Sequence, residues 1–266
     1  MKRVFLLRAY GDFLVAIQSL LNSPVSCEFE IIASRHHLPL FEAIKDSIDT
    51  STINIRFEDF KIQQSQLRLF TNRHLLHLDT IKELSALKKF LHANATAGSQ
   101  NYIDQKIRKQ LLELITGEHF ESIRTEGFMY DAFHRFFKTE KVEILNRVHA
   151  NRRILILPSA RLSKRDLPET LINTIQQKHS KENDSVQVAY FKNTKRADAL
   201  TYQSFAELVR LISAADFIYG ADSLPIHLSY LLKKPHYILY PEHGSNLFFT
   251  PYAIENHYFS AFNSFE

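Results

Sequence analysis

Short runs of hydrophobic residues alternate along the chain with segments in which hydrophobic positions recur every three or four residues. The first third contains five such segments, in this order: Val4–Leu7, Phe13–Leu21, Phe29–Ala33, Phe41–Ile48 and Ile53–Phe57. The first, third and fifth are short apolar runs of the kind that form strands, whereas the second and fourth have helical spacing. This third of the chain therefore predicts a βαβαβ half-sheet.

The middle of the chain has a different pattern. From Leu67 to Ile115 the spacing is mainly helical, and no run there is distinct enough for us to assign a strand. Around Lys138–Arg153 the sequence becomes polar and charged, and a buried strand pattern begins directly afterwards at Ile154. Because polar stretches commonly link domains, we expect an N-terminal lobe at residues 1–148 and a C-terminal lobe at residues 149–266.

The second half repeats the alternation of strands and helices. The expected strands are Ile154–Leu157, Val186–Phe191, Phe217–Tyr219 and Tyr237–Tyr240, and the expected helices are Leu167–Gln177, Phe205–Ile212 and Pro225–Leu232. Strands that alternate with helices pair in parallel through right-handed crossovers. The whole pattern predicts an α/β protein of two Rossmann-like lobes.

Composition limits the cellular compartments and the kinds of binding partner that we expect for this chain. The chain of 266 residues carries a formal charge of +4 and a sequence pI near 9.0, which permits affinity for phosphates, nucleic acids or anionic membranes. Basic residues are interspersed with acidic ones, however, which favours a solvated surface over a nucleic-acid-binding stripe. The single cysteine, Cys27, allows no internal disulfide, and no hydrophobic run approaches the ~20 residues of a membrane-spanning helix. We expect a cytoplasmic protein that binds no nucleic acid.

Polar residues that could bind a ligand follow the expected strands. In an open parallel sheet, ligands bind beyond the carboxyl ends of the strands, where helix N-termini favour anions. Gly11-Asp12 follows the first strand; glycine permits a tight turn there, and the aspartate either caps the next helix or points into the cleft. From these residues alone both roles remain open.

Two further clusters lie in the second half. After its first strand, the hydroxyl group of Ser159 and the adjacent cations Lys164 and Arg165 form either a diphosphate cradle or an ordinary exposed basic loop. Gly220–His227 follows the third strand of this half, and Ser223 is expected to cap the helix that begins there. The free amide groups of that helix N-terminus can also bind phosphate.

In this order, the three clusters resemble the ADP-heptose:lipopolysaccharide heptosyltransferase family, the glycosyltransferase family 9 enzymes of GT-B fold. Gly11-Asp12 is similar to the Gly-Asp turn after the family's first strand. Ser163-Lys164-Arg165 with Leu167-Pro168 is similar to its SKRWP phosphate loop, and Ala214–Leu228 resembles its ADLVIGNDSGPMHLA signature. The strong part of the resemblance spans Ile154–Tyr252, and the N-terminal lobe matches only at its first turn.

The resemblance implies two Rossmann-like lobes facing a central cleft, with the acceptor on the N-terminal lobe. It implies an inverting transfer, without a metal or other cofactor, from a nucleotide-sugar to a lipopolysaccharide or surface-glycan acceptor, with an ADP-sugar favoured as donor. Asp12 would act as general base on the acceptor hydroxyl. Donor-binding roles would fall to these residues: Ser159, Lys164, Arg165, Asp222, Ser223, His227 and Glu242. A glycolipid acceptor would permit peripheral association with the inner face of the membrane.

Some positions depart from the family pattern. Leu224 stands where the family has glycine, which puts a bulky side chain where the backbone should approach phosphate. The whole chain has only 6 glycines, which is few for several phosphate-binding turns. These departures support a second hypothesis, an inactive homologue that binds a ligand or serves as a scaffold.

Two other features have ordinary interpretations. His74 and His77 lie about one helical turn apart without a third ligand, so we interpret them as surface residues rather than a metal site. The aromatic tail from Phe248 to Phe265 is expected to pack back across the cleft.

Overall fold

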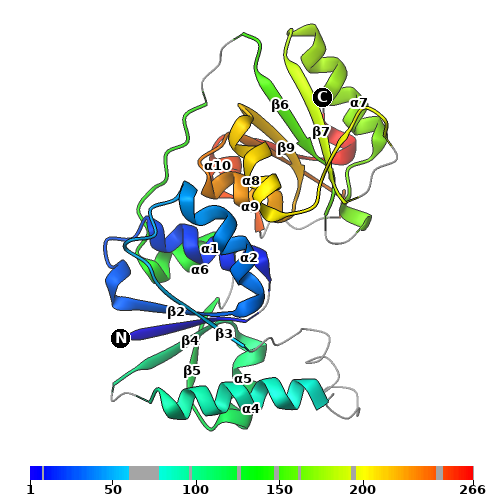
Figure 1. Cartoon of the computed structure of the whole chain (residues 1–266). Coiled ribbons are helices and arrows are strands. Elements are labelled where there is room, and N and C mark those ends of the chain that lie inside the picture. Colours follow the sequence, from blue (N-terminus) through cyan, green and yellow to red (C-terminus); the bar gives the residue numbers. More distant parts are fainter. Residues whose placement is uncertain are drawn as a thin grey trace. The chain divides into compact units, whose positions relative to one another are not determined.

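The computed structural model describes residues 1–265 except for Arg8 and residues 60–77, 96–97, 125–126, 147–149, 161–162, 193–195 and 244–247. His74 and His77 therefore lie outside the described residues. Two compact units make up the chain: Met1–Lys45 with Asp49–Glu140, and Asp46–Ile48 with Lys141–Glu266. Each unit has its own parallel sheet, so the α/β class and the two Rossmann-like units expected from the sequence are confirmed (Figure 1).

The first unit is built on a five-stranded sheet of order β3-β2-β1-β4-β5, whose pairings are parallel. Its strands are β1 (Lys2–Leu6), β2 (Phe29–Ser34), β3 (Asn54–Glu58), β4 (Gln100–Gln105) and β5 (Phe120–Arg124). Its α-helices are α1 (Tyr10–Leu21), α2 (Leu38–Ile44), α4 (Leu78–Ala93), α5 (Lys106–Thr116) and α6 (Met129–Phe137). In Figure 1, α1, α2 and α6 cover one face of this sheet, and α4 and α5 cover the other.

The expectation of a mainly helical middle region was wrong at β4, which lies inside it. This strand pairs with β1 and β5, and it carries a buried polar contact in which Arg3 Nε donates to Asn101 Oδ1 at 2.9 Å. Because Arg3 satisfies Asn101, a polar residue occupies a position that would otherwise be apolar. The hydrophobic pattern of a strand is therefore interrupted, and the sequence alone does not reveal it. β5 was not predicted either.

The second unit contains a six-stranded sheet of order β11-β10-β9-β6-β7-β8. Its strands are β6 (Arg153–Leu157), β7 (Ser185–Phe191), β8 (Leu200–Tyr202), β9 (Phe217–Ala221), β10 (His236–Tyr240) and β11 (Phe259–Ala261). Its α-helices are α7 (Glu169–Lys181), α8 (Phe205–Ala214), α9 (Leu224–Leu231) and α10 (Pro251–Glu255). The strands and helices expected in this half are all present, whereas the short edge strands β8 and β11 and the helix α10 were not predicted.

Both faces of the second sheet are covered by helices. Along β9, Phe217 and Tyr219 belong to a core cluster with Ile172 of α7, while a side-chain carbon at Gly220 would meet Ile226 of α9. Successive residues of a strand point to opposite faces, so α7 and α9 lie on opposite sides of β9. Burial on both faces explains why the strands of this half read as continuous hydrophobic runs.

The aromatic tail packs on the second unit itself. Tyr258, Phe262 and Phe265 lie against the core cluster between the second sheet and α7, and the Phe265 ring meets the Tyr219 and Tyr237 rings edge-on at centroid distances of 5.9 and 5.5 Å. These described contacts are with the tail's own unit, whereas we expected packing across a cleft. Aromatic pairs in this geometry stabilise a core beyond their buried area.

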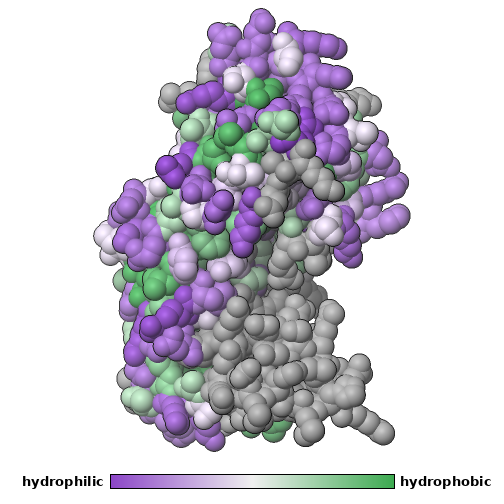
Figure 2. Space-filling view, turned by 45° about the vertical axis from the view of Figure 1, so that its right-hand side comes forward, coloured by the Kyte–Doolittle hydropathy of each residue, from purple (hydrophilic) through white to green (hydrophobic). Residues whose placement is uncertain are grey.

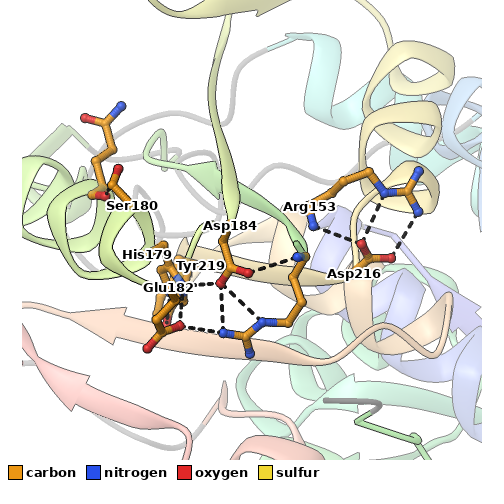
Figure 3. A network of polar contacts seen from close by, with 9 residues as sticks. Arg153, His179, Ser180, Glu182, Asp184, Asp216 and Tyr219 are labelled. Carbon is orange, nitrogen blue, oxygen red and sulfur yellow. Dashed lines mark hydrogen bonds and ion pairs between the residues drawn. The ribbon is translucent and has the colours of Figure 1, made fainter. Parts of the chain in front are cut away.

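A network of charged residues lies at the amino ends of strands in this sheet, as Figure 3 shows. Asp184 accepts hydrogen bonds from the backbone N–H of Arg152 at 2.9 Å and from its guanidinium Nη2 at 2.9 Å. His179 bridges Asp184 and Tyr219, with its Nδ1 2.8 Å from the carboxylate and its Nε2 2.9 Å from the phenol oxygen. This network joins α7 to the starts of β6 and β7 and to β9.

The surface of the described residues is mainly hydrophilic on the face drawn in Figure 2, and hydrophobic residues form small separate patches there. None of the helices described by the structure combines the length and the apolar character required to cross a membrane.

Candidate functional site

The carboxyl ends of β6 and β9 bring together two of the three polar clusters singled out in the sequence. The two strands are neighbours, with Leu157 opposite Gly220, so the loops that follow them lie side by side. Ser223 Oγ donates to the backbone carbonyl of Ser159 at 3.5 Å and to that of Ala221 at 3.1 Å. The two clusters, which are far apart in the sequence, thus form one edge of the second unit.

Two hydrogen bonds, one to a side chain and one between backbone groups, connect the two ends of the basic loop, which runs from Pro158 to Leu167. Its residues Ser163–Arg165 form a 3₁₀ turn. Asp166 Oδ1 accepts a hydrogen bond from the Ala160 N–H at 2.7 Å, and the Leu167 N–H donates to the Pro158 carbonyl at 3.0 Å. Sequence reasoning assigned no role to Asp166, although aspartate in a loop commonly accepts hydrogen bonds from nearby backbone N–H groups.

Asp222 is the buried charge of this edge. Asp222 directly follows the last residue of β9, and it is only 8% exposed. Arg165 Nη1 lies 3.5 Å from Asp222 Oδ2, whereas Lys164 on the same turn is exposed. Burial raises the pKa of Asp222 to about 6, and the positive charge of Arg165 opposes that rise. A carboxyl group that titrates near neutral pH beside a cation is typical of a functional site.

The N-terminus of α9 is available to an anion. Ser223 occupies the N-cap position, as expected, but its side chain accepts no cap hydrogen bond within the described part of the chain. Its hydroxyl group donates to carbonyl oxygens instead. In the first turn Pro225 has no N–H and the Ile226 N–H donates to the Ser223 carbonyl at 3.1 Å, which leaves the Leu224 N–H at the helix start for water or a ligand. Leu224 is the first residue of this helix and is half-buried.

Two predicted donor-binding residues lie in different surroundings. His227 is one turn into α9 and 6% exposed, and its pKa is lowered to about 4 by burial and, to a smaller extent, by the nearby His236. It is therefore neutral at physiological pH. Glu242 lies on the exposed turn after β10, where it accepts a hydrogen bond from Asn263 Nδ2 at 2.9 Å.

Asp12 belongs to the first unit and lies inside a helix. Because α1 begins at Tyr10 with Ala9 as its N-cap, Asp12 is in the first helical turn and is not the cap residue, which decides against the capping alternative. Its side chain is 9% exposed, and within the described residues its buried Oδ2 has no hydrogen-bond partner. The helix dipole favours a negative charge at this position. A carboxylate oxygen left without a partner can accept a proton from a bound molecule.

One group of metal-ligating side chains occurs among the described residues, at the amino ends of the strands. Ligand atoms of His179, Glu182 and Asp184 lie within 4.8 Å of one another. The Arg152 guanidinium already lies 2.7 Å from Glu182 and 2.9 Å from Asp184. Since this cation compensates both carboxylates, we interpret the group as part of the structural network in Figure 3.

Comparison with known proteins adds a likeness of fold. No family model and no curated protein matches the chain. The Escherichia coli heptosyltransferase WaaC with ADP matches with a TM-score of 0.56 and 11% identity, covering 93% of this chain and 89% of that chain. A glycosyltransferase of family 9 from Veillonella parvula matches with a TM-score of 0.60 and 10% identity, covering 98% and 84%.

A third solved structure, the E. coli ADP-heptose lipopolysaccharide heptosyltransferase II, matches with a TM-score of 0.55 and 15% identity, covering 98% of this chain and 89% of that chain. All three likenesses extend over both units. The chain therefore has the two-unit GT-B fold of these glycosyltransferases, as the sequence motifs led us to expect.

Proposed function

We propose, starting from this glycosyltransferase fold, that the chain is an inverting, metal-independent glycosyltransferase. Its donor is a nucleotide-sugar, with an ADP-sugar favoured, and its acceptor is a glycan or glycolipid such as a lipopolysaccharide precursor. Solved structures of WaaC contain ADP or ADP-2-deoxy-2-fluoro heptose, which supports an ADP-sugar as donor for a chain of the same fold.

The observation that carries this proposal is the carboxylate of Asp12. It stands in the first turn after β1, buried, with one oxygen that no described residue engages. A buried acceptor without a partner destabilises a fold, so a functional reason for keeping it is expected. An acceptor hydroxyl group supplies the missing hydrogen bond and the proton that a general base removes.

The proposed reaction is a single displacement. Asp12 takes the proton of the acceptor hydroxyl while the acceptor oxygen forms a bond to the anomeric carbon of the sugar. The bond between that carbon and the diphosphate oxygen breaks, and its electron pair leaves with the nucleoside diphosphate. Attack from the face opposite the leaving group inverts the anomeric configuration.

The second unit would stabilise the leaving group. Lys164 and Arg165 bring positive charge to the edge where α9 begins with the Leu224 N–H and without a side-chain cap. Cations and helix N-terminal amides both stabilise the negative charge that develops on a departing diphosphate. Ser159, Ser223 and Glu242 are proposed to contact the nucleotide or the sugar.

The test is nucleotide release from a panel of ADP-, GDP- and UDP-sugars. Asp12→Asn keeps the shape of the side chain but removes its basicity, so we expect turnover to fall about 100-fold or more while binding of the nucleotide is retained. Asp131→Asn is the matched control, because Asp131 is also a first-turn aspartate of a helix in the same unit, α6. Unchanged turnover in Asp12→Asn would show that Asp12 is not the base.

Leu224 favours a second candidate function. It places a large side chain at the first residue of α9, where an anion would approach the amides. The chain would then be an inactive homologue that binds a ligand or acts as a scaffold. Nucleotide binding without release from any sugar donor in the same panel would favour this candidate, and detectable turnover would rule it out.

A further inference from the structure

The carboxyl group of Asp222 lies among groups that attract anions. It follows β9 directly and precedes the first turn of α9, whose amides have no side-chain cap within the described residues. The 3₁₀ turn with Lys164 and Arg165 adds positive charge at the same edge. A carboxylate that is 8% exposed in this position repels any phosphate oxygen that approaches the Leu224 N–H at the start of α9.

Arg165 compensates only part of that negative charge. Its Nη1 is 3.5 Å from Asp222 Oδ2, longer than the ~2.8 Å of a strong charge-assisted hydrogen bond. The Arg165 side chain is also 40% exposed, so solvent weakens the pair. Burial is consequently the larger influence on the pKa of Asp222, which is raised to about 6.

We propose that Asp222 takes up a proton from solvent when a diphosphate group binds at the N-terminus of α9, and that the neutral carboxyl group then donates a hydrogen bond to a phosphate oxygen. This inference rests on the proposed function, because it assigns the diphosphate of the donor to this edge. A protonated carboxyl group gains a donor and loses the charge that repels phosphate. Arg165 is then free to turn from Asp222 to the anion.

Few titratable groups on the surrounding elements could take the place of Asp222. They are Lys164 and Arg165 on the 3₁₀ turn, His227 on α9, and Tyr240, Glu242 and His243 at the end of β10 and after it. Among the described residues, the charge that acts on Asp222 is that of Arg165. The comparison of the wild type with Asp222→Asn therefore decides whether a proton taken up at this edge is bound by Asp222.

The experiment is isothermal titration calorimetry of the full chain with ADP and, separately, with inorganic pyrophosphate. Titrations at pH 7.0 in two buffers of different ionisation enthalpy give the number of protons taken up on binding. The variant is Asp222→Asn, whose amide group donates a hydrogen bond without needing a proton. The control is Asp216→Asn. Asp216 directly precedes the first residue of β9, at the end of the strand away from Asp222, and it pairs with Arg153.

We expect Asp222→Asn to take up about one proton fewer than the wild type, and Asp216→Asn to match the wild type. Between pH 7 and 8 the Kd of the wild type should rise about tenfold relative to that of Asp222→Asn. The reason is that binding to the wild type includes the uptake of a proton by Asp222, and the proton concentration falls tenfold over this range. At pH 8, Asp222→Asn should bind more tightly than the wild type. Melting temperatures confirm that each variant is folded.

Equal proton uptake by wild type and Asp222→Asn, with equal or weaker binding by the variant, would overturn this inference and leave the donor site intact. Failure of both ADP and pyrophosphate to bind the folded wild type would overturn the donor site of the proposed function, and this inference with it. Pyrophosphate separates a wrong nucleotide base from the absence of a diphosphate site, because it carries no base.

Discussion

Gly220 shows how one residue fixes the distance between a strand and the helix that follows it. A side-chain carbon at this position would lie 2.9 Å from Ile226 Cδ1 and 3.6 Å from the Leu157 carbonyl oxygen. The first distance is shorter than any ordinary contact between carbon atoms, and Ile226 is only 1% exposed. Glycine here lets β9 pack closely on α9 without displacing the buried Ile226 side chain.

We predict that Gly220→Ala destabilises the protein by about 1–3 kcal/mol, the usual effect of overpacking a dense core. Urea denaturation measures the loss. Ile226→Val removes the carbon that would clash, so the double variant should be more stable than the sum of the two single effects. Strictly additive effects would mean that Ile226 is not the obstacle.

Asp12 and Asp222 contrast at the same scale. Both are buried aspartates beside a helix N-terminus, yet Asp12 lies within the first turn of α1 whereas Asp222 precedes the N-cap of α9. The first position has a favourable helix dipole and an oxygen without a described partner; the second has one long contact to Arg165. These surroundings are consistent with the two proposed roles, a general base at Asp12 and a proton-binding group at Asp222.

At the scale of elements, Arg152 connects the starts of β6 and β7 with the end of α7. Although burial acts to raise the pKa of Asp184, hydrogen bonds from Arg152 and His179 hold it below its usual value. Asp184 is nearly buried, with 2% of its side chain exposed. This cluster lies at the amino ends of the strands, whereas ligands of open α/β sheets bind at the carboxyl ends. We therefore expect it to affect stability rather than activity.

We predict that Arg152→Met lowers the free energy of unfolding by about 3 kcal/mol, because it leaves a buried carboxylate without its cation. Arg153→Met is the matched control: Arg153 also pairs with an aspartate, Asp216, but its side chain is 63% exposed. Its loss should be below about 1 kcal/mol. Similar losses in the two variants would contradict a structural role for the Arg152 network.

At the scale of the second unit, three of its described buried groups affect folding in opposite directions when they gain a proton between pH 7.5 and 4.5. Burial lowers the pKa of His227 and His236 to about 4, so the unfolded chain binds protons more readily as pH falls below about 6.5. The free energy of unfolding therefore falls between about pH 6.5 and 4, because the two histidines stay neutral in the folded protein while they gain protons in the unfolded chain. Asp222, with its raised pKa, has the opposite effect, because the folded protein binds a proton first.

We predict that these three groups contribute a net loss of about 3 kcal/mol to the free energy of unfolding between pH 7.5 and 4.5, since each pKa unit corresponds to about 1.4 kcal/mol and the two histidines outweigh the aspartate. Urea denaturation at both pH values measures it. In Asp222→Asn the loss should be larger by about 2 kcal/mol, because the compensating group is gone. A loss no larger than in the wild type would place the raised pKa of Asp222 in doubt.

The sequence by itself determined the α/β class, the longer strands and helices of the second half, and the three polar clusters after strands. These features depend on local spacing and on short motifs, which a chain carries without its fold. It did not reveal β4, β5, β8 or β11, because their residues become strand only by pairing with a neighbour: β4 contains polar positions that distant residues such as Arg3 satisfy, and the described β8 and β11 have three residues each.

Only the tertiary structure decided how the candidate groups are arranged. Spacing in the sequence could not show that Ser223 turns toward Ser159, that Arg165 reaches Asp222, or that Asp12 lies inside its helix rather than at the cap. The first two are contacts between residues that are close only because their strands are neighbours. The third depends on where the helix begins. Burial, which gives Asp222 its unusual pKa, is likewise a property of the packed sheet and not of any short segment of sequence.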